Sequence, residues 1–149
     1  LRVSAKRVAG WWKDTGKPED LLQANRLVLS QIARDVSGEV VDADVAGEVV
    51  VAEGARIVRS EVRGPAHIAA GAVIEDGYVG PYTSIGQDAR VIRSEIEYSI
   101  LMDEAELRNL PRRVDASVIG QGVRVEGRGG DLRQNTLQLF LGDQSQVRL

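Results

Sequence analysis

The chain has 149 residues, of which 43% are hydrophobic, and this is enough apolar material for one core and a possible appendage. Its 19 basic and 22 acidic residues leave a formal net charge of -3 with both signs scattered along the chain, so nucleic acid and anionic membranes are not expected as partners. The absence of cysteine excludes disulfide bonds and thiolate zinc sites, and no apolar run approaches the ~20 residues of a membrane-spanning helix, so a cytoplasmic enzyme is the default expectation.

The N-terminal part of the chain has the pattern of a strand followed by a helix. Residues Leu1 to Val8 alternate like a strand, with no initiating methionine and no turn before them, and we interpret the chain as part of something longer. Gly16 and Pro18 are turn and helix-start signals, because proline suits the first helical turn. The larger apolar residues between Leu21 and Ile32 fall mostly on one side of a 3.6-residue period. The pattern predicts an amphipathic helix from Pro18 to about Ile32.

From Val36 onward, aliphatic residues recur with a period of 17. Successive aliphatic positions are five, six and six residues apart, and the fifth position of a six-residue step is often small, as at Ala55 and Ala72. This hexapeptide signature predicts a mainly β fold, a left-handed parallel β-helix from about Val36 to Val125, in which aliphatic residues point inward from three flat sides and small residues fit at the corners. The three columns are Val40, Ile57, Ile74 and Val91; Val45, Val62, Val79 and Ile96; and Val51, Ile68, Ile85 and Met102.

The last coil of this pattern is displaced along the sequence. The same spacing returns at Val114, Ile119 and Val125, each 23 residues beyond its counterpart, which is one period plus six. Six extra residues, interpreted as Arg108 to Arg113, are therefore expected to loop out, because proline and charge suit an exposed loop. A register that begins at Leu101 would shift this loop by about a residue.

The order of motifs along the chain is distinctive. The stretch from Gly10 to Leu22 contains the sequence Trp-Lys-Asp-Thr-Gly. This stretch is followed by Gln-Ala-Asn-Arg-Leu and then by the hexapeptide coils. The sequence Leu-Phe-Leu-Gly-Asp comes near the end of the chain, at Leu139 to Asp143. In this order the segments resemble the long form of the glucose-1-phosphate thymidylyltransferase family over essentially the whole chain. The resemblance implies that residues 1–35 are the C-terminal edge of an α/β nucleotidyltransferase domain. Residues 36–149 would then be the left-handed β-helix, closed by a capping strand from about Thr136 to Leu141.

The resemblance also implies an activity for the whole protein. Such an enzyme joins dTTP to glucose 1-phosphate and releases pyrophosphate, an early step of deoxysugar nucleotide biosynthesis, with Mg²⁺ held by carboxylates. Asp14 matches one of those carboxylates and would be a metal ligand, a role that suits phosphoryl transfer because Mg²⁺ neutralises charge at the α-phosphate. The alternative is a structural role, in which the Asp14 side chain caps the helix or forms a hydrogen bond in a turn. Trp12 could stack on the base or sugar, although tryptophan at a strand end more often packs in a core or domain interface.

Further expectations come from the same resemblance. The glycine-rich loop, a second metal-binding aspartate and the sugar-binding residues would precede Leu1, so the isolated chain is expected to be inactive. The nucleobase and the sugar are inferred from the resemblance alone. A homo-oligomer is expected, since the β-helix presents repeated flat faces.

Two other functions are weighed against this one. A hexapeptide-repeat acyltransferase needs a histidine as base, and His67 is the only histidine, at the end of a hexapeptide where an exposed corner residue is the commoner explanation. The β-helix could instead serve only as an oligomerisation or regulatory module. The Gly120-Gln-Gly122 sequence is a weak match to a phosphate loop. Repeat-matched carboxylates are interpreted as solvated corner residues and not as a metal site: Glu61, Glu95, Asp103 and Glu104.

Overall fold

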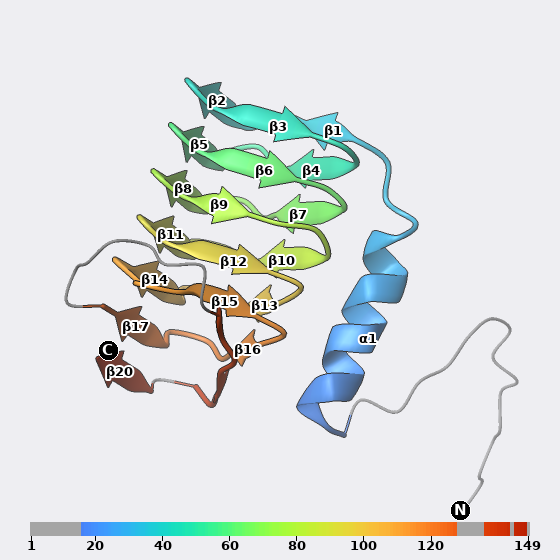
Figure 1. Ribbon diagram of the computed structural model, residues 1–149. Coiled ribbons are helices and arrows are strands. Elements are labelled where there is room, and N and C mark those ends of the chain that lie inside the picture. Colours follow the sequence, from blue (N-terminus) through green and yellow to red (C-terminus); the bar gives the residue numbers. More distant parts are fainter. Residues whose placement is uncertain (1–15, 128–135, 144, 149) are drawn as a thin grey trace, which may run out of the picture.

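The computed structural model describes residues 16–127, 136–143 and 145–148. In this part of the chain one helix, α1 (Pro18–Leu29), is followed by short strands that wind into a β-solenoid (Figure 1). Successive strands pass in turn to three sheets, which we call A, B and C, and neighbouring strands within each sheet are parallel.

The strands of each sheet follow one another in spatial order. Sheet A consists of β1 (Asp35–Val36), β4 (Val49–Val51), β7 (Ala66–Ile68), β10 (Thr83–Ile85), β13 (Ile100–Leu101), β16 (Val118–Ile119) and β19 (Phe140–Leu141). Sheet B consists of β2 (Glu39–Val41), β5 (Arg56–Val58), β8 (Val73–Glu75), β11 (Arg90–Ile92), β14 (Glu106–Arg108), β17 (Arg124–Glu126) and β20 (Gln146–Arg148). Sheet C consists of β3 (Asp44–Ala46), β6 (Glu61–Arg63), β9 (Tyr78–Val79), β12 (Glu95–Glu97), β15 (Arg113–Asp115) and β18 (Thr136–Leu137).

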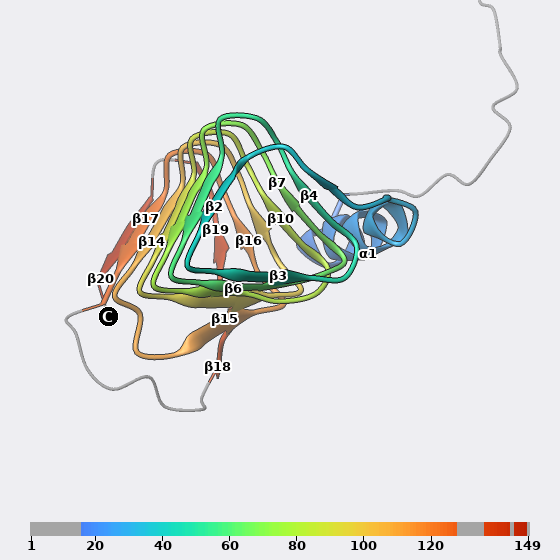
Figure 2. The same ribbon diagram turned by 90° about the horizontal axis from the view of Figure 1, so that it is seen from above.

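Successive coils stack in register because the sequence period places equivalent residues side by side. In sheet B, Ile57 pairs with Ile74 and Ile74 pairs with Val91, at the expected spacing of 17. The inward side chains of the three sheets form one buried core along the solenoid axis. Seen along that axis, the coils are triangular, and the chain turns counterclockwise from β2 through β3 to β4 as it recedes from the viewer, which makes the helix left-handed (Figure 2). The expected left-handed parallel β-helix is therefore confirmed.

Buried serine hydroxyls join the corners of successive coils. Ser94 is fully buried; its Oγ donates to the carbonyl of Ile92 at 2.9 Å and accepts the backbone N–H of Leu110 in the next coil at 3.2 Å. Ser60 makes the equivalent bonds two periods earlier, to the carbonyl of Val58 and from the N–H of Gly77. Each hydroxyl therefore satisfies a backbone donor that a corner cannot pair with another strand.

Helix α1 lies along the outer surface of sheet A (Figures 1 and 2) and contacts β10 and β16. Pro18 is in its first turn, as expected, and Leu22 and Leu29, two turns apart, are buried. The helix ends at Leu29, three residues earlier than expected. Its apolar side is also narrower than the sequence pattern suggests, because Leu27 and Val28 are exposed.

The register of the coils changes by one residue after β10. Ile85 pairs with Leu101 and not with Met102, and Val91 pairs with Leu107, sixteen residues further along the chain. The expected place of Met102 in the core column is therefore wrong. Two adjacent apolar residues both satisfy the hexapeptide pattern, and the structure takes the alternative register that begins at Leu101.

The expected six-residue loop from Arg108 to Arg113 is also wrong. Arg108 ends β14 and Arg113 begins β15, so both belong to strands of the solenoid. The corner between these strands, residues 109–112, is longer by two residues than its counterpart between β2 and β3. Leu110 in this corner is 1% exposed and belongs to the buried core of the solenoid.

The C-terminal segment continues the solenoid. β18 pairs with β15 in sheet C, β19 pairs with β16 in sheet A, and β20 pairs with β17 in sheet B, all in parallel. The expected single strand from Thr136 to Leu141 is thus two strands on different sheets. Together they extend the solenoid by part of a coil. Within the described ranges, no helix has the length and apolarity that a transmembrane segment requires.

We expect Ser94→Ala to lower the free energy of unfolding by about 1 to 3 kcal/mol, because the buried N–H of Leu110 loses its acceptor. The measurement is urea unfolding followed by circular dichroism. Ser37→Ala is the matched control: the hydroxyl of Ser37 is exposed and bonds to Asp35, so its loss should cost less than about 0.5 kcal/mol. Equal stabilities of the two variants would contradict the role given to the corner serines.

Candidate functional site

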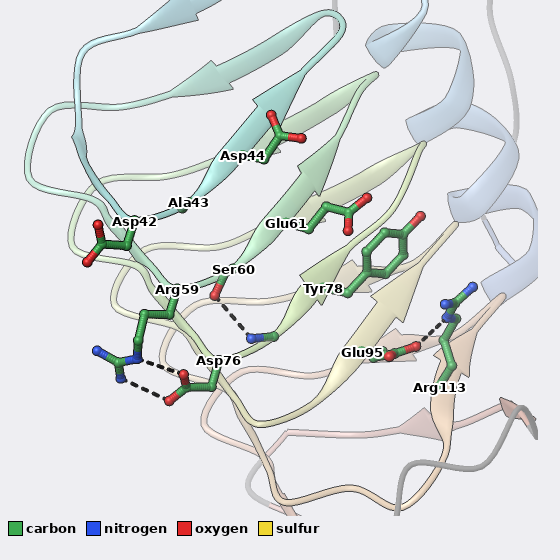
Figure 3. A pocket seen from close by; sticks show the side chains of 11 residues that line it. Asp42, Ala43, Asp44, Arg59, Ser60, Glu61, Asp76, Tyr78, Glu95 and Arg113 are labelled. Carbon is green, nitrogen blue, oxygen red and sulfur yellow. Dashed lines mark hydrogen bonds and ion pairs between the residues drawn. The ribbon is translucent and has the colours of Figure 1, made fainter.

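A groove of about 1050 Å³ runs along the outside of the solenoid (Figure 3). It follows sheet C and the adjacent corner with sheet B, so that each coil contributes side chains at equivalent positions. Five of its lining residues are acidic and two are arginines, and a tyrosine stands among them. The lining consists of Asp42, Ala43, Asp44, Arg59, Ser60, Glu61, Asp76, Gly77, Tyr78, Glu95 and Arg113.

The corner between sheets B and C carries an ion pair between neighbouring coils. Arg59 and Asp76 are one period apart and both have a left-handed backbone, with φ of 45° and 49°. The guanidinium of Arg59 donates to both carboxylate oxygens of Asp76, at 2.8 and 2.9 Å, and to Glu75 at 2.8 Å. The hydrogen bond from Arg59 holds the pKa of Asp76 below its ordinary value. The same column continues with Arg93, which donates to Asn109 of the following coil at 2.5 Å.

The other end of the groove is organised around Arg113. Its Nε donates to Glu95 at 2.8 Å, its Nη1 lies 3.3 Å from Glu97, and its guanidinium carbon lies 4.6 Å from the ring centroid of Tyr78. Burial, and then the negative charge of Glu97, raise the pKa of the Tyr78 phenol above its ordinary value. At this end of the groove, the charge of Arg113 is therefore paired with two carboxylates beside the ring of Tyr78.

The chemistry available in the groove is limited. Both arginines are engaged by carboxylates, and carboxylates outnumber guanidinium groups, so the groove does not suit a phosphate-bearing ligand. Within the described residues, no group of three or more His, Asp or Glu side chains could hold a metal ion. The carboxylates Glu61 and Glu95 lie on strands and pair with arginines, and are not solvated corner residues as expected.

His67 lies at the middle of β7 and not at a corner, so the sequence-based interpretation of its position is wrong. Its side chain lines a second, largely apolar groove of about 400 Å³ beside Ser84, Ile100 and Met102. Burial lowers the pKa of the imidazole below its ordinary value. The one carboxylate that lines the same groove, that of Asp103, accepts the backbone N–H of Gln87.

The remaining residues singled out from the sequence divide into two groups. Asp14 and Trp12 lie outside the described residues. Asp103 accepts the backbone N–H of Gln87 at 2.8 Å, which makes it a corner residue with a structural hydrogen bond. Gly120 packs closely against the backbone of the next coil, at Gly142 and Asp143, as a corner residue of the solenoid.

The groove itself was not anticipated from the sequence. The signal was available in the outward positions of the 17-residue repeat, where Asp44, Glu61, Tyr78 and Glu95 form one column. The inward columns decide the fold, whereas this outward column decides which side chains line the groove.

No family model matches the chain. It is 41% identical over 148 residues to the glucose-1-phosphate thymidylyltransferase of Streptomyces antibioticus, a match that covers 99% of this chain and 41% of that protein. The thymidylyltransferase of Streptomyces griseus is 40% identical over 148 residues, with the same two coverages. The chain is homologous to part of these enzymes. It is also 44% identical over 150 residues to the low-salt glycan biosynthesis nucleotidyltransferase Agl11 of Haloferax volcanii, over 99% of this chain and 42% of that protein.

These similarities confirm the resemblance seen in the sequence. They extend over nearly the whole chain, and so include the segment before α1 as well as the solenoid. The chain spans about two fifths of the length of the relatives it matches.

Tyr78 allows a direct test of the electrostatics of the groove. Because its folded-state pKa is raised, its contribution to stability is present below pH 10.0, its ordinary pKa, and is lost as the pH rises through the higher folded value. Ultraviolet titration of the phenols should therefore show a component with a midpoint above 10.0 that Tyr78→Phe removes. Glu97→Gln should lower that midpoint, whereas Tyr98→Phe should leave the component in place. If Tyr78→Phe left the titration curve above pH 10.0 unchanged, the raised pKa would not belong to Tyr78.

Proposed function

We propose that this chain is part of a sugar-1-phosphate nucleotidyltransferase, specifically a glucose-1-phosphate thymidylyltransferase that converts dTTP and glucose 1-phosphate to dTDP-glucose and pyrophosphate. The observation that carries the proposal is the similarity over 99% of the chain to proteins of that name. The confirmed order of helix and left-handed coils supports it, because hexapeptide coils alone occur with many activities.

In this reaction a phosphate oxygen of the sugar phosphate attacks the α-phosphorus of the nucleotide, and the bond to the leaving pyrophosphate breaks. Magnesium, when bound, would neutralise the charge that gathers on the phosphates. The described residues contain no metal-binding group, so magnesium binding by this chain rests on Asp14. We assign the second carboxylate ligand, the phosphate-binding loop and the sugar-binding residues to the part of the protein that this chain does not span. The contact of Trp12 with base or sugar belongs to the same proposal.

The solenoid has a different role in this proposal. The groove along sheet C is acidic and its arginines are already paired, so this groove does not compete for nucleoside triphosphate. The solenoid instead supports the segment that precedes it and presents flat faces through which the protein forms a homo-oligomer. An acyltransferase is disfavoured, because the one carboxylate in the groove beside His67, that of Asp103, is bonded to the backbone of Gln87. Micromolar binding of acetyl-CoA would reverse this ranking.

In the intact protein, Asp14→Asn should lower turnover by roughly 10²-fold or more, about 3 kcal/mol of transition-state stabilisation, because the substitution removes a charged metal ligand. Asp14→Ala should behave similarly. The assay is pyrophosphate release from dTTP and glucose 1-phosphate in the presence of Mg²⁺. His67→Ala is the control and should change turnover little. Near-normal turnover in both Asp14 variants would reassign that residue to a turn or cap, and turnover by the 149-residue chain alone would refute the assignment of the active site to the rest of the protein.

Light scattering of the intact protein should give the mass of a homo-oligomer at micromolar concentration. The 149-residue chain should retain self-association, because the proposal places the contacts on the solenoid. A monomer at high protein concentration would contradict this part of the proposal.

A further inference from the structure

The contact between α1 and the solenoid combines apolar burial with specific polar bonds. Leu22 and Leu29 are 5% and 2% exposed, and they anchor the helix against sheet A. Apolar burial is not directional, so these two leucines alone would leave the helix free to slide or turn by small amounts. A polar contact between them fixes the position.

Asn25 provides that contact. Its Nδ2 donates to the carbonyl of Tyr82 at 3.1 Å, and its Oδ1 accepts the hydroxyl of Ser84 at 2.6 Å. The guanidinium carbon of Arg26, the next residue of the helix, lies 5.1 Å from the ring centroid of Tyr82. We call these four residues, Asn25, Arg26, Tyr82 and Ser84, the α1 latch.

The solenoid side of the latch is rigid. Ser84 is at the centre of β10, where it pairs with His67 on one side and with Ile100 on the other. Tyr82 has a left-handed backbone with φ of 57° and lies edge-to-face with Tyr98 of the next coil, with ring centroids 6.4 Å apart. Both groups that bond to Asn25 are thus held by neighbouring coils.

A second attachment follows the helix. The backbone N–H of Arg34 donates to Glu48 at 2.7 Å, and its guanidinium donates to the carbonyls of Gly47 and Val45 at 2.9 and 3.0 Å. The chain is therefore fixed to the solenoid both at the middle of α1 and at the end of the connection to β1. Only the N-terminal end of the helix leads toward the Trp-x-Asp-Thr-Gly motif, and Pro18 follows Asp14 by four positions.

We propose that Asn25 and Ser84 are positioning residues for nucleotidyl transfer. Through the latch the solenoid fixes the orientation of α1, which begins four positions after Asp14 in the sequence. This inference rests on the proposed function. Its physical basis is that phosphoryl transfer depends on the placement of reacting groups, so that displacements of about 1 Å far from the chemistry cost up to 10²-fold in rate. The latch acts through α1 and touches no substrate.

The test uses the intact protein with dTTP, glucose 1-phosphate and Mg²⁺. Ser84→Ala and Asn25→Leu should each lower kcat by roughly tenfold, with the KM of each substrate changed by less than about twofold. The double variant should lose little more than either single variant, because both remove the same contact. Ser84→Thr keeps the hydroxyl on a strand that tolerates a β-branched residue, and it should restore kcat relative to Ser84→Ala. Ser94→Ala is the matched control: it removes a buried serine hydroxyl at the opposite corner, and it should lower stability without lowering kcat.

Amide hydrogen exchange of the same proteins separates the latch from the activity. Exchange should accelerate in residues 18–29 of Ser84→Ala, while the coils stay protected. Unchanged exchange in α1, or faster exchange with an unchanged kcat, would overturn the positioning role even in an active enzyme. An equal loss of kcat in Ser94→Ala would overturn it as well. If the wild type itself released no pyrophosphate, the proposed function would fail first and the positioning role with it.

Discussion

The whole molecule depends on one constraint, the parallel pairing of each coil with the coil that follows it. A single coil cannot bury its aliphatic residues or satisfy its backbone, so every coil is stable only because its neighbours supply both. Ile57, Ile74 and Val91 show this in sheet B, where each is fully buried and pairs with the next. The same pairing fixes everything on the outside, including the ion pairs of the groove and the platform on which α1 lies. The register of the buried strands therefore determines which side chains lie next to one another on the outer surface.

The sequence predicts this architecture well because the register repeats. A period of 17 requires only that aliphatic residues recur, and the left-handed hexapeptide pattern follows from the small residues at the corners. The prediction fails where the pattern is locally ambiguous. Leu101 and Met102 are adjacent and both apolar, so the choice between them depends on backbone pairing with Ile85, which sequence spacing does not contain. The prediction of an exposed loop at Leu110 is wrong for a related reason. A leucine between proline and charged residues looks like part of a loop in the sequence, although Leu110 is buried beside Ser94.

The candidate site illustrates a different limit. The resemblance to nucleotidyltransferases, which the similar proteins confirm, extends over essentially the whole chain, but the candidate metal ligand Asp14 lies outside the described residues. The end of a hexapeptide predicts a corner position for His67, whereas the structure places this residue at the middle of β7. The contact of Asn25 with Ser84 joins residues 59 positions apart, and no sequence pattern relates them. Helix periodicity indicated which face of α1 is apolar, but not which coil it meets.

At the corner between sheets B and C, the charges of the side chains repeat with a longer period than the backbone does. Its left-handed positions are Asp42, Arg59, Asp76, Arg93 and Asn109, so that acidic and basic residues alternate over the first four of these coils. The backbone repeats every coil, whereas the charge pattern repeats every two coils. Loss of one whole coil would preserve the stacking of the strands, about 4.8 Å apart, yet it would bring two like charges together at this corner. Loss of two coils would preserve both patterns. From Asp42 to Arg93, this corner can therefore shorten without electrostatic cost only by a pair of coils.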